Sequence, residues 1–154
     1  MGIEIERKFL VRSEAWRALG QPVRIRQGYL SVDKERTVRV RTLGSAAKLT
    51  IKGRSVGTAR SEYEYDLPVD EANELLDGLC LRPLLDKART TLVLGAHTWE
   101  VDEFFGENAG LVVAEVELRA ADEHVELPAW VGAEVSSDAR YFNANLIAHP
   151  FSRW

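Results

Sequence analysis

Apolar and polar residues alternate along most of this chain, as they do in β-strands that have one apolar face. In the first segment, GIEIERKFLV (2–11), Ile3 and Ile5 share one face, and Glu4 and Glu6 share the other. Short breaks that contain glycine or charged residues separate the alternating segments, as expected for hairpin connections. The pattern predicts eight strands, over residues 3–11, 22–30, 36–42, 47–53, 59–67, 84–94, 97–104 and 111–119.

Three segments carry signals for helices instead. Residues 13–19 form a short predicted helix with Ser13 at its cap. In residues 68–79, Asp70 stands at the expected N-cap and apolar side chains follow at helical spacing. Residues 137–149 begin with Ser-Asp and place their apolar side chains on one face. The chain of 154 residues contains no internal repeat or linker, so it is expected to form one domain over residues 1–154.

Eight sequential antiparallel strands with short turns favour a closed barrel over an open sheet. An open sheet would leave two unprotected edges, which closure removes. A barrel of eight strands also has room inside for side chains and one small ligand. The predicted fold is therefore mainly β (α+β), an eight-stranded antiparallel closed barrel with few peripheral helices.

Each predicted strand has one charged face and one apolar face, and two arrangements satisfy that pattern. In the first, the apolar faces form the core and the charges lie in solvent, which is the usual position of charged residues. In the second, the charges line a hydrophilic tunnel, and helices and a partner chain cover the apolar outer faces.

The distribution of charge favours the tunnel. Four strands bring pairs of acidic residues and four bring pairs of basic residues, whereas a solubilising surface intersperses the two signs. Several basic pairs are arginines at i, i+2 spacing, and arginine is suited to bidentate contact with phosphate oxygens. The acidic set is Glu4, Glu6, Glu62, Glu64, Glu100, Asp102, Glu115 and Glu117, and the basic set is Lys8, Arg24, Arg26, Arg39, Arg41, Lys52, Lys87 and Arg89.

These two sets suit chemistry on phosphate groups. Clustered carboxylates repel one another and stay ionised only when cations neutralise them. Mg²⁺ prefers oxygen ligands and is typically shared between a few carboxylates and the phosphates of a substrate. An acidic half that binds metal and a basic half that binds a polyanion therefore fit phosphoryl transfer.

Composition excludes several other classes of protein. The formal net charge of −4 argues against a non-specific nucleic-acid binder, which needs a basic excess. No apolar run approaches the ~18 residues of a membrane span, and the charges at positions 4–8 prevent a signal peptide. The single cysteine, Cys80, rules out an intramolecular disulfide. We expect a cytoplasmic protein with no nucleic-acid or membrane partner.

Glu4-x-Glu6-x-Lys8 resembles the ExExK signature of the CYTH superfamily, the triphosphate tunnel metalloenzymes. The resemblance covers essentially the whole chain and continues, in the order of the family, through RQGYL (26–30), RVR (39–41), LTIKG (49–53), EYEYDL (62–67), DKART (86–90), WEVDEF (99–104), AEVEL (114–118) and EVSSDARYFNANLI (134–147). It implies an eight-stranded tunnel with a hydrophilic, charged interior and a C-terminal helix, here 138–148, at one mouth. It also implies triphosphate substrates and a Mg²⁺ or Mn²⁺ cofactor, with two metal ions.

The resemblance implies a role for each matched residue. Tyr29 beside Lys52 resembles a pair that orients substrate or leaving group in some members, and with Lys8 these form the expected catalytic set. Which of Glu62 and Glu64 binds metal is left open. The expected metal ligands are Glu4, Glu6, Glu62, Glu64, Asp102, Glu115 and Glu117. The expected phosphate-binding residues are Lys8, Arg26, Arg39, Arg41, Lys52, Lys87 and Arg89.

The leading hypothesis is a triphosphatase that hydrolyses inorganic tripolyphosphate to pyrophosphate and phosphate with a metal-activated water. The compact chain resembles the short bacterial members of the family that prefer this substrate. A class IV-type adenylate cyclase and a thiamine triphosphatase are alternatives within the family. A non-catalytic polyphosphate-binding module is an alternative of another class, although such a module has no need of the acidic set. Exposed outer faces of the barrel are compatible with a homodimer.

Overall fold

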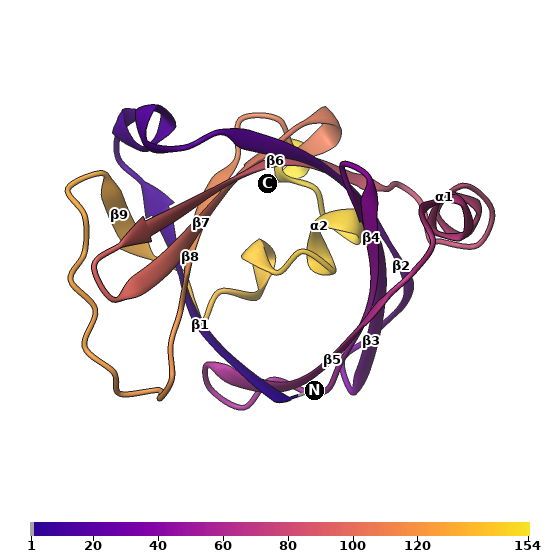
Figure 1. Ribbon diagram of the computed structural model, residues 1–154, viewed down its shortest axis with the longest axis horizontal. Helices are drawn as coiled ribbons and strands as arrows, with labels where there is room; N and C mark the ends of the chain where they lie inside the picture. Colours follow the sequence, from indigo (N-terminus) through magenta and orange to yellow (C-terminus); the bar gives the residue numbers. More distant parts are fainter. Residues whose placement is uncertain (1) are drawn as a thin grey trace.

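The computed structural model describes residues 2–154 and shows a ring of antiparallel strands (Figure 1). The strands are β1 (Gly2–Val11), β2 (Pro22–Asp33), β3 (Arg36–Leu43), β4 (Ala46–Lys52), β5 (Ala59–Asp66), β6 (Leu85–Leu94), β7 (His97–Phe104), β8 (Val112–Glu117) and β9 (Val131–Glu134). They follow the order β5-β4-β3-β2-β6-β7-β8-β1-β9, and a further pairing of β5 with β1 closes the ring of β1 to β8. The predicted closed barrel of eight strands is confirmed.

Strand β1 closes the ring because its two halves pair with different strands. Residues Gly2–Ile5 pair with β5, and residues Glu6–Leu10 pair with β8. The second half of β1 also pairs with β9 through Phe9 and Val11. The sequence pattern did not predict β9, because its four residues, VGAE, are too few to show an alternation.

The helical elements are shorter than the sequence predicts. Helix α1 (Val69–Gly78) begins after Pro68, so the N-cap expected at Asp70 is wrong, and Asp70 instead lies in the first turn, where it favours the helix dipole. The segment 13–19 contains only the 3₁₀ helix η1 (Ala15–Leu19). A further 3₁₀ turn, η2 (Gly106–Asn108), lies between β7 and β8.

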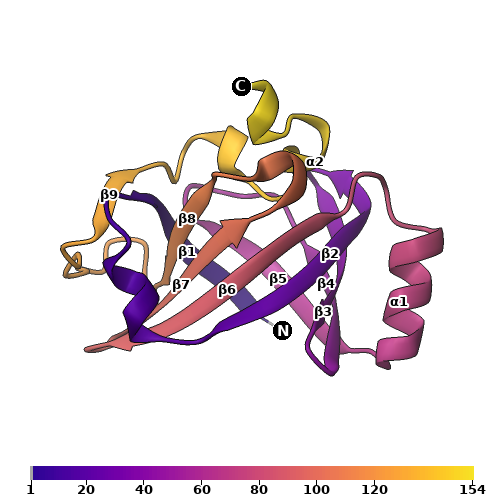
Figure 2. The ribbon, with the colours of Figure 1, turned by 90° about the horizontal axis from the view of Figure 1, so that it is seen from above.

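The predicted helix over 137–149 is two separate short elements, the 3₁₀ turn η3 (Ala139–Tyr141) and the helix α2 (Asn145–Ala148), and η4 (Phe151–Arg153) follows them. Phe142 adopts an extended conformation that ends η3. Leu146 and Ile147 of α2 are buried in a cluster with residues of the barrel. Figure 2 shows this C-terminal segment lying across one end of the strands.

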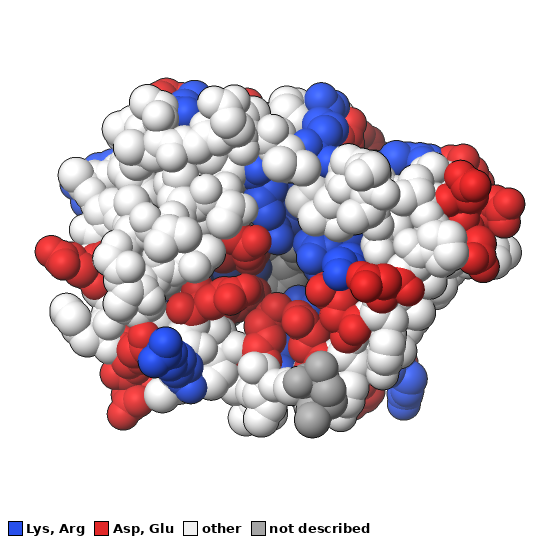
Figure 3. All heavy atoms as spheres, in the orientation of Figure 1, with Lys and Arg blue, Asp and Glu red and all other residues white. Residues whose placement is uncertain are grey.

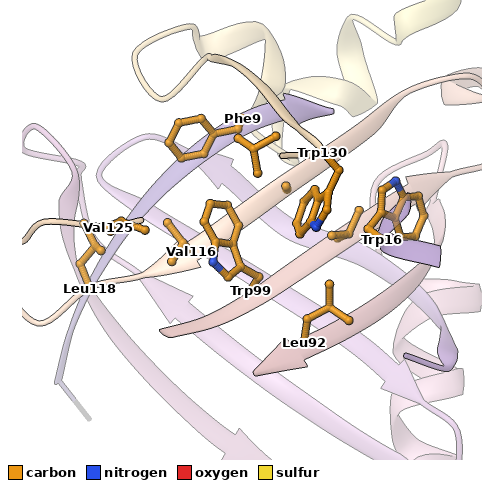
Figure 4. Close-up of a cluster of buried hydrophobic side chains, with 11 residues drawn as sticks. Phe9, Trp16, Leu92, Trp99, Val116, Leu118, Val125 and Trp130 are labelled. Carbon is orange, nitrogen blue, oxygen red and sulfur yellow. The ribbon is translucent and has the colours of Figure 1, made fainter. Parts of the chain in front are cut away.

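The apolar outer faces of the strands are covered, as the tunnel arrangement requires. Helix α1 packs Ala72 and Leu76 against Val40 and Ala47 of β3 and β4. On the opposite side, Trp99 of β7 is fully buried. It contacts Phe9 and Trp130, with ring centroids 5.7 and 5.6 Å away, in a cluster completed by Trp16, Leu92, Val101, Ala114, Val116, Leu118, Val125 and Val131 (Figure 4).

One part of the barrel exterior stays open to solvent. Ile3 of β1 is 73% exposed, and Tyr63 and Tyr65 of β5 are exposed beside it on the outer face. This surface is where the expected homodimer contact would lie, and that expectation stays a prediction. Within residues 2–154, no helix has the length and apolar character needed to cross a membrane.

Candidate active site

The register of the strands decides which side chains face the barrel interior. Residues that lie opposite each other on paired strands point to the same side of the sheet. Glu6 lies opposite Glu117, Lys8 opposite Glu115, and Thr50 opposite both Arg39 and Glu64. The charged faces of β1, β3, β4, β5, β7 and β8 therefore point inward.

The inward side chains surround a cavity of about 390 Å³. Figure 3 shows one end of the barrel, where acidic and basic side chains gather around a hollow. The predicted site residues that line the cavity are Glu4, Glu6, Lys8, Tyr29, Arg39, Arg41, Lys52, Glu62, Glu64, Arg89, Glu115 and Glu117.

Arg26 is the clearest error in the predicted phosphate-binding set. Strand β2 presents the opposite parity to the interior, because Gln27 and Tyr29 lie opposite the inward Arg41 and Arg39. Arg26 therefore points outward, where its guanidinium bonds to Asn73 and Asp77 of α1. Its neighbour on the same face, Arg24, forms a bidentate ion pair with Asp86 outside the barrel.

Lys87 and Asp102 point inward but lie behind the wall of the cavity. Lys87 is 0% and Asp102 is 1% exposed. The two oxygens of Asp102 accept hydrogen bonds from Lys87 Nζ at 2.8 Å and from Arg89 Nε and Nη2 at 2.8 and 2.9 Å. Although burial opposes ionisation, these two cations lower the pKa of Asp102 to about 2. Asp102 and Lys87 therefore contact each other outside the cavity lining, and their expected roles in binding metal and phosphate stay predictions.

Lys8 lies between two inward carboxylates. Its Nζ is 2.5 Å from Glu115 Oε1 and 3.3 Å from Glu6 Oε1. Burial and the nearby charge of Glu115 raise the pKa of Glu6 to about 7, despite the opposing charge of Lys8. Burial alone would lower the pKa of Lys8, but the negative charges of Glu115 and Glu6 outweigh it and raise that pKa. The positive charge near Glu6 is therefore too small to offset the effects that raise its pKa.

Lys52 makes an equivalent contact with a second carboxylate pair. Its Nζ donates to both oxygens of Glu4, at 2.8 and 3.0 Å, and lies 3.4 Å from Glu62. Burial raises the pKa of Glu4 and outweighs the charge of Lys52, and the neighbouring Glu62 raises it further. Each of the two carboxylate pairs thus contacts a single lysine.

Arg39 and Arg41 form a basic wall with unused donors. Arg39 contacts Thr50 Oγ1 at 3.3 Å, and Arg41 contacts Glu64 at 3.4 Å. The Nε atoms of both arginines are buried and have no hydrogen-bond partner among residues 2–154. Burial and the charges of Arg39 and Arg89 lower the pKa of Arg41 to about 10, which still leaves it protonated at neutral pH. The two Nε donors of this wall could therefore bind an additional anion.

Tyr29 and Lys52, which the resemblance pairs in orienting substrate, both line the cavity, and that role stays a prediction. Tyr29 is 3% exposed, and its hydroxyl accepts a long hydrogen bond of 3.5 Å from Gln27. Burial raises the pKa of Tyr29 against the charges of Arg39 and Lys8. In the described chain, no hydrogen bond joins Tyr29 to Lys52.

Sequence reasoning missed two parts of the cavity lining. Arg60 of β5 lines the cavity and donates to the carbonyl of Gly53 at 3.0 and 3.1 Å. Its parity, which it shares with Glu62 and Glu64, could have identified it. The resemblance placed the C-terminal segment at one mouth of the tunnel but named none of its residues as lining, and it contributes Ala139, Phe142, Asn143, Ala144 and Asn145.

The carboxylate pairs can hold a divalent cation only together with other oxygen ligands. In the part of the chain that the structure describes, no three carboxylate, imidazole or thiolate side chains converge on one point. Mg²⁺ commonly binds through one or two carboxylates, with water and substrate phosphates completing its shell. The pairs Glu4–Glu62 and Glu6–Glu115 fit that requirement, and the raised pKa values of Glu4 and Glu6 indicate that additional positive charge would be favourable there.

Comparisons with known proteins identify the family of this chain. The CYTH domain model matches residues 2–151. An inorganic triphosphatase from Acetivibrio thermocellus is 47% identical over 154 residues, which cover 100% of this chain and 99% of that protein. One from Nitrosomonas europaea is 32% identical over 146 residues, 93% of this chain and 95% of that protein. A solved structure of an inorganic triphosphatase superposes with a TM-score of 0.64 at 31% identity, over 93% of this chain and 96% of that one. The chain belongs to the CYTH domain family.

Proposed function

We propose that this protein is a metal-dependent hydrolase of triphosphates and that inorganic tripolyphosphate is its preferred substrate. The observation that carries the proposal is the cavity, in which carboxylate pairs face two arginines whose Nε donors have no partner among residues 2–154. Two relatives that are named inorganic triphosphatases support it, as does the family. A volume of about 390 Å³ is near the lower end of small-molecule sites and suits a short polyphosphate.

The chain's own residues would bind and orient the substrate. Arg39 and Arg41 present fixed guanidinium groups to the phosphate oxygens. Arg89 is held in place by its bonds to Asp102 and by Glu100, 3.1 Å away, and it reaches the cavity beside them. These fixed cations would restrain the phosphate chain in one orientation, which is most of what catalysis of phosphoryl transfer requires.

The two lysines of the site would change partners when substrate and metal bind. In the structure, Lys8 and Lys52 neutralise the carboxylate pairs. Glu4 with Glu62, and Glu6 with Glu115, would hold Mg²⁺ or Mn²⁺, which would neutralise phosphate charge and activate the attacking water. Lys8 and Lys52 would then be free to donate to phosphate oxygens, so the charge of the cavity stays balanced.

Phosphate release from four substrates tests the proposal directly. Tripolyphosphate, ATP, thiamine triphosphate and pyrophosphate are each supplied with Mg²⁺, with Mn²⁺ or with EDTA. We expect tripolyphosphate to be hydrolysed fastest, and we expect EDTA to abolish turnover. Formation of a cyclic nucleotide from ATP would show a cyclase instead. Binding of tripolyphosphate with no turnover under any condition would show a binding module.

A pair of arginine variants tests the placement of β2. Arg26→Ala should leave kcat/KM for tripolyphosphate within about twofold of wild type, because Arg26 bonds to α1 outside the barrel. Arg41→Ala should lower kcat/KM by roughly 10- to 100-fold, the cost of one hydrogen bond to a charged group. Steady-state kinetics of both variants measure the difference. An equal loss of kcat/KM in the two variants would contradict the assignment of Arg26 to the outer face of β2.

A further inference from the structure

The C-terminal segment is part of the cavity wall as well as a cover for the barrel end. Leu146 and Ile147 are buried against Leu85 and Phe104 inside that end. Phe142, Asn143 and their neighbours line the cavity instead. The extended residue Phe142 separates η3 from α2 and allows the two groups to face different surroundings.

Asn143 is the residue of this segment with unused hydrogen-bonding groups. Its side chain makes no hydrogen bond within residues 2–154, and its Oδ1 is buried without a partner. An unsatisfied buried polar group costs about 1–3 kcal/mol, so such groups call for an explanation. Six buried side-chain polar atoms in the described chain lack partners, and five lie in the barrel interior or line its cavity, on Gln27, Arg39, Arg41, Thr58 and Asn143. Asn143 Oδ1 is an acceptor and cannot bind an anion, but Nδ2 of the same amide makes no hydrogen bond within residues 2–154 and is a donor that could bind one.

A second asparagine fixes the segment in place. Asn108 of η2 is 4% exposed, and its Oδ1 accepts a hydrogen bond from the backbone of Phe151 at 2.8 Å. Its Nδ2 donates a longer bond of 3.5 Å to the carbonyl of Leu146. Leu146 is itself 0% exposed. Asn108 therefore anchors the segment that carries Asn143 at two points, one within α2 and one just after it.

We propose that Asn143 contacts the substrate, donating its amide N–H to a phosphate oxygen of the bound triphosphate, and that Asn108 is a positioning residue for this contact. The inference rests on the proposed function and adds a residue to its binding site. A neutral amide gives a directed hydrogen bond without adding to the positive charge that Lys8, Arg39 and Arg41 already supply. The contact would therefore fix the orientation of one phosphoryl group. The cations alone would select less strongly among the phosphates of the polyanion.

Two substitutions at Asn143 test the direction of the hydrogen bond. Asn143→Ala should lower kcat/KM for tripolyphosphate by roughly 10- to 100-fold, since one hydrogen bond to a charged group is lost. Asn143→Asp should lower it further, because a carboxylate repels phosphate. Calorimetric titration of tripolyphosphate in EDTA should show the same order of affinities without turnover. Asn73→Ala, which removes an amide outside the barrel, is the matched control and should match wild type.

A third variant tests the positioning role of Asn108. Asn108→Ala should lower both the melting temperature and kcat/KM. Combined with Asn143→Ala, it should cause no further loss of kcat/KM, since residues that act through one contact are not additive. Additive losses would overturn the positioning role.

The test separates this inference from the proposed function. Wild-type kinetics and affinity in a folded Asn143→Ala variant, or tripolyphosphate binding by Asn143→Asp as tight as wild type, would overturn the contact while leaving an active triphosphatase. Absence of phosphate release from the wild-type protein would instead overturn the proposed function, and the titration in EDTA would still decide the contact.

Discussion

Replacing Glu6 with glutamine is expected to abolish hydrolysis of tripolyphosphate without unfolding the protein. The carboxylate of Glu6 has a pKa raised to about 7 by burial and by Glu115, so its ionised form is costly in the metal-free protein. Glutamine has the same shape and no charge, and it should preserve or increase thermal stability. Loss of a proposed metal ligand should reduce kcat by roughly 10²–10³-fold, as found for groups that stabilise charge in a transition state.

Thermal denaturation with and without Mg²⁺, together with steady-state kinetics, measures these effects. Wild type should gain stability from Mg²⁺ plus tripolyphosphate, because a ligand that binds only the folded state stabilises it, and Glu6→Gln should gain less. Glu103→Gln is the matched control, since Glu103 pairs with Arg17 on the outer face of β7. A Glu6→Gln variant that hydrolyses tripolyphosphate at the wild-type rate would remove Glu6 from the metal site.

Replacing Asp102 with asparagine is expected to destabilise the fold strongly. Asp102 is the buried anion between Lys87 and Arg89, and Lys87 has no exposed surface. Burial already lowers the pKa of Lys87 to about 8, even though Asp102 opposes that shift. Removing one partner of a buried ion pair costs about 3–5 kcal/mol, because the remaining charge is left uncompensated. Chemical denaturation of the variant measures this loss in the free energy of unfolding.

Two further variants show whether burial of charge causes the loss. Asp86→Asn breaks the exposed bidentate pair with Arg24 and should cost no more than about 1 kcal/mol. The double variant Lys87→Met with Asp102→Leu removes both buried charges and should recover much of the stability lost in Asp102→Asn. A loss in Asp102→Asn no larger than that in Asp86→Asn would contradict the buried ion-pair interpretation.

The pKa of Asp102 also predicts how the free energy of unfolding changes at acidic pH. The pKa of Asp102 is about 2 in the folded protein and about 3.9 in an unfolded chain. A lowered carboxyl pKa stabilises the fold above the unfolded value, and the contribution disappears as pH falls through the folded value. On the acid side, the difference in stability between wild type and Asp102→Asn should therefore shrink as the pH falls from about 4 to 2. A difference that stays constant down to pH 2 would exclude this contribution.

Much of the site follows from alternation along single strands. The inward set on β1, Glu4, Glu6 and Lys8, was predicted from parity and confirmed by the cavity that these residues line. The same holds for Arg39 and Arg41 on β3. Most charged residues of these strands share one parity, with Arg7 and Arg36 as the exceptions, and closure into a barrel placed the shared parity inside.

Strand β2 shows why parity alone is insufficient. Its charged residues, Arg24 and Arg26, share a face just as those of β3 do, but Gln27 and Tyr29 on the other face point inward. The outer face of β2 near Arg26 meets α1, whose Asn73 and Asp77 supply hydrogen-bond partners that no local pattern reveals. A charged face can therefore be an outer face wherever another element provides its counter-charge.

The sequence by itself determined the positions of the eight barrel strands and the segregation of acid from base among them, because alternation with period two is a local property. Only the tertiary structure decided that β2 turns its charged face outward. It also decided that Asp102 would bind Lys87 and Arg89, and that Asn143 would reach the cavity. These outcomes depend on strand register and on contacts between distant segments, such as the bond from Asn108 to Phe151, which local spacing does not encode.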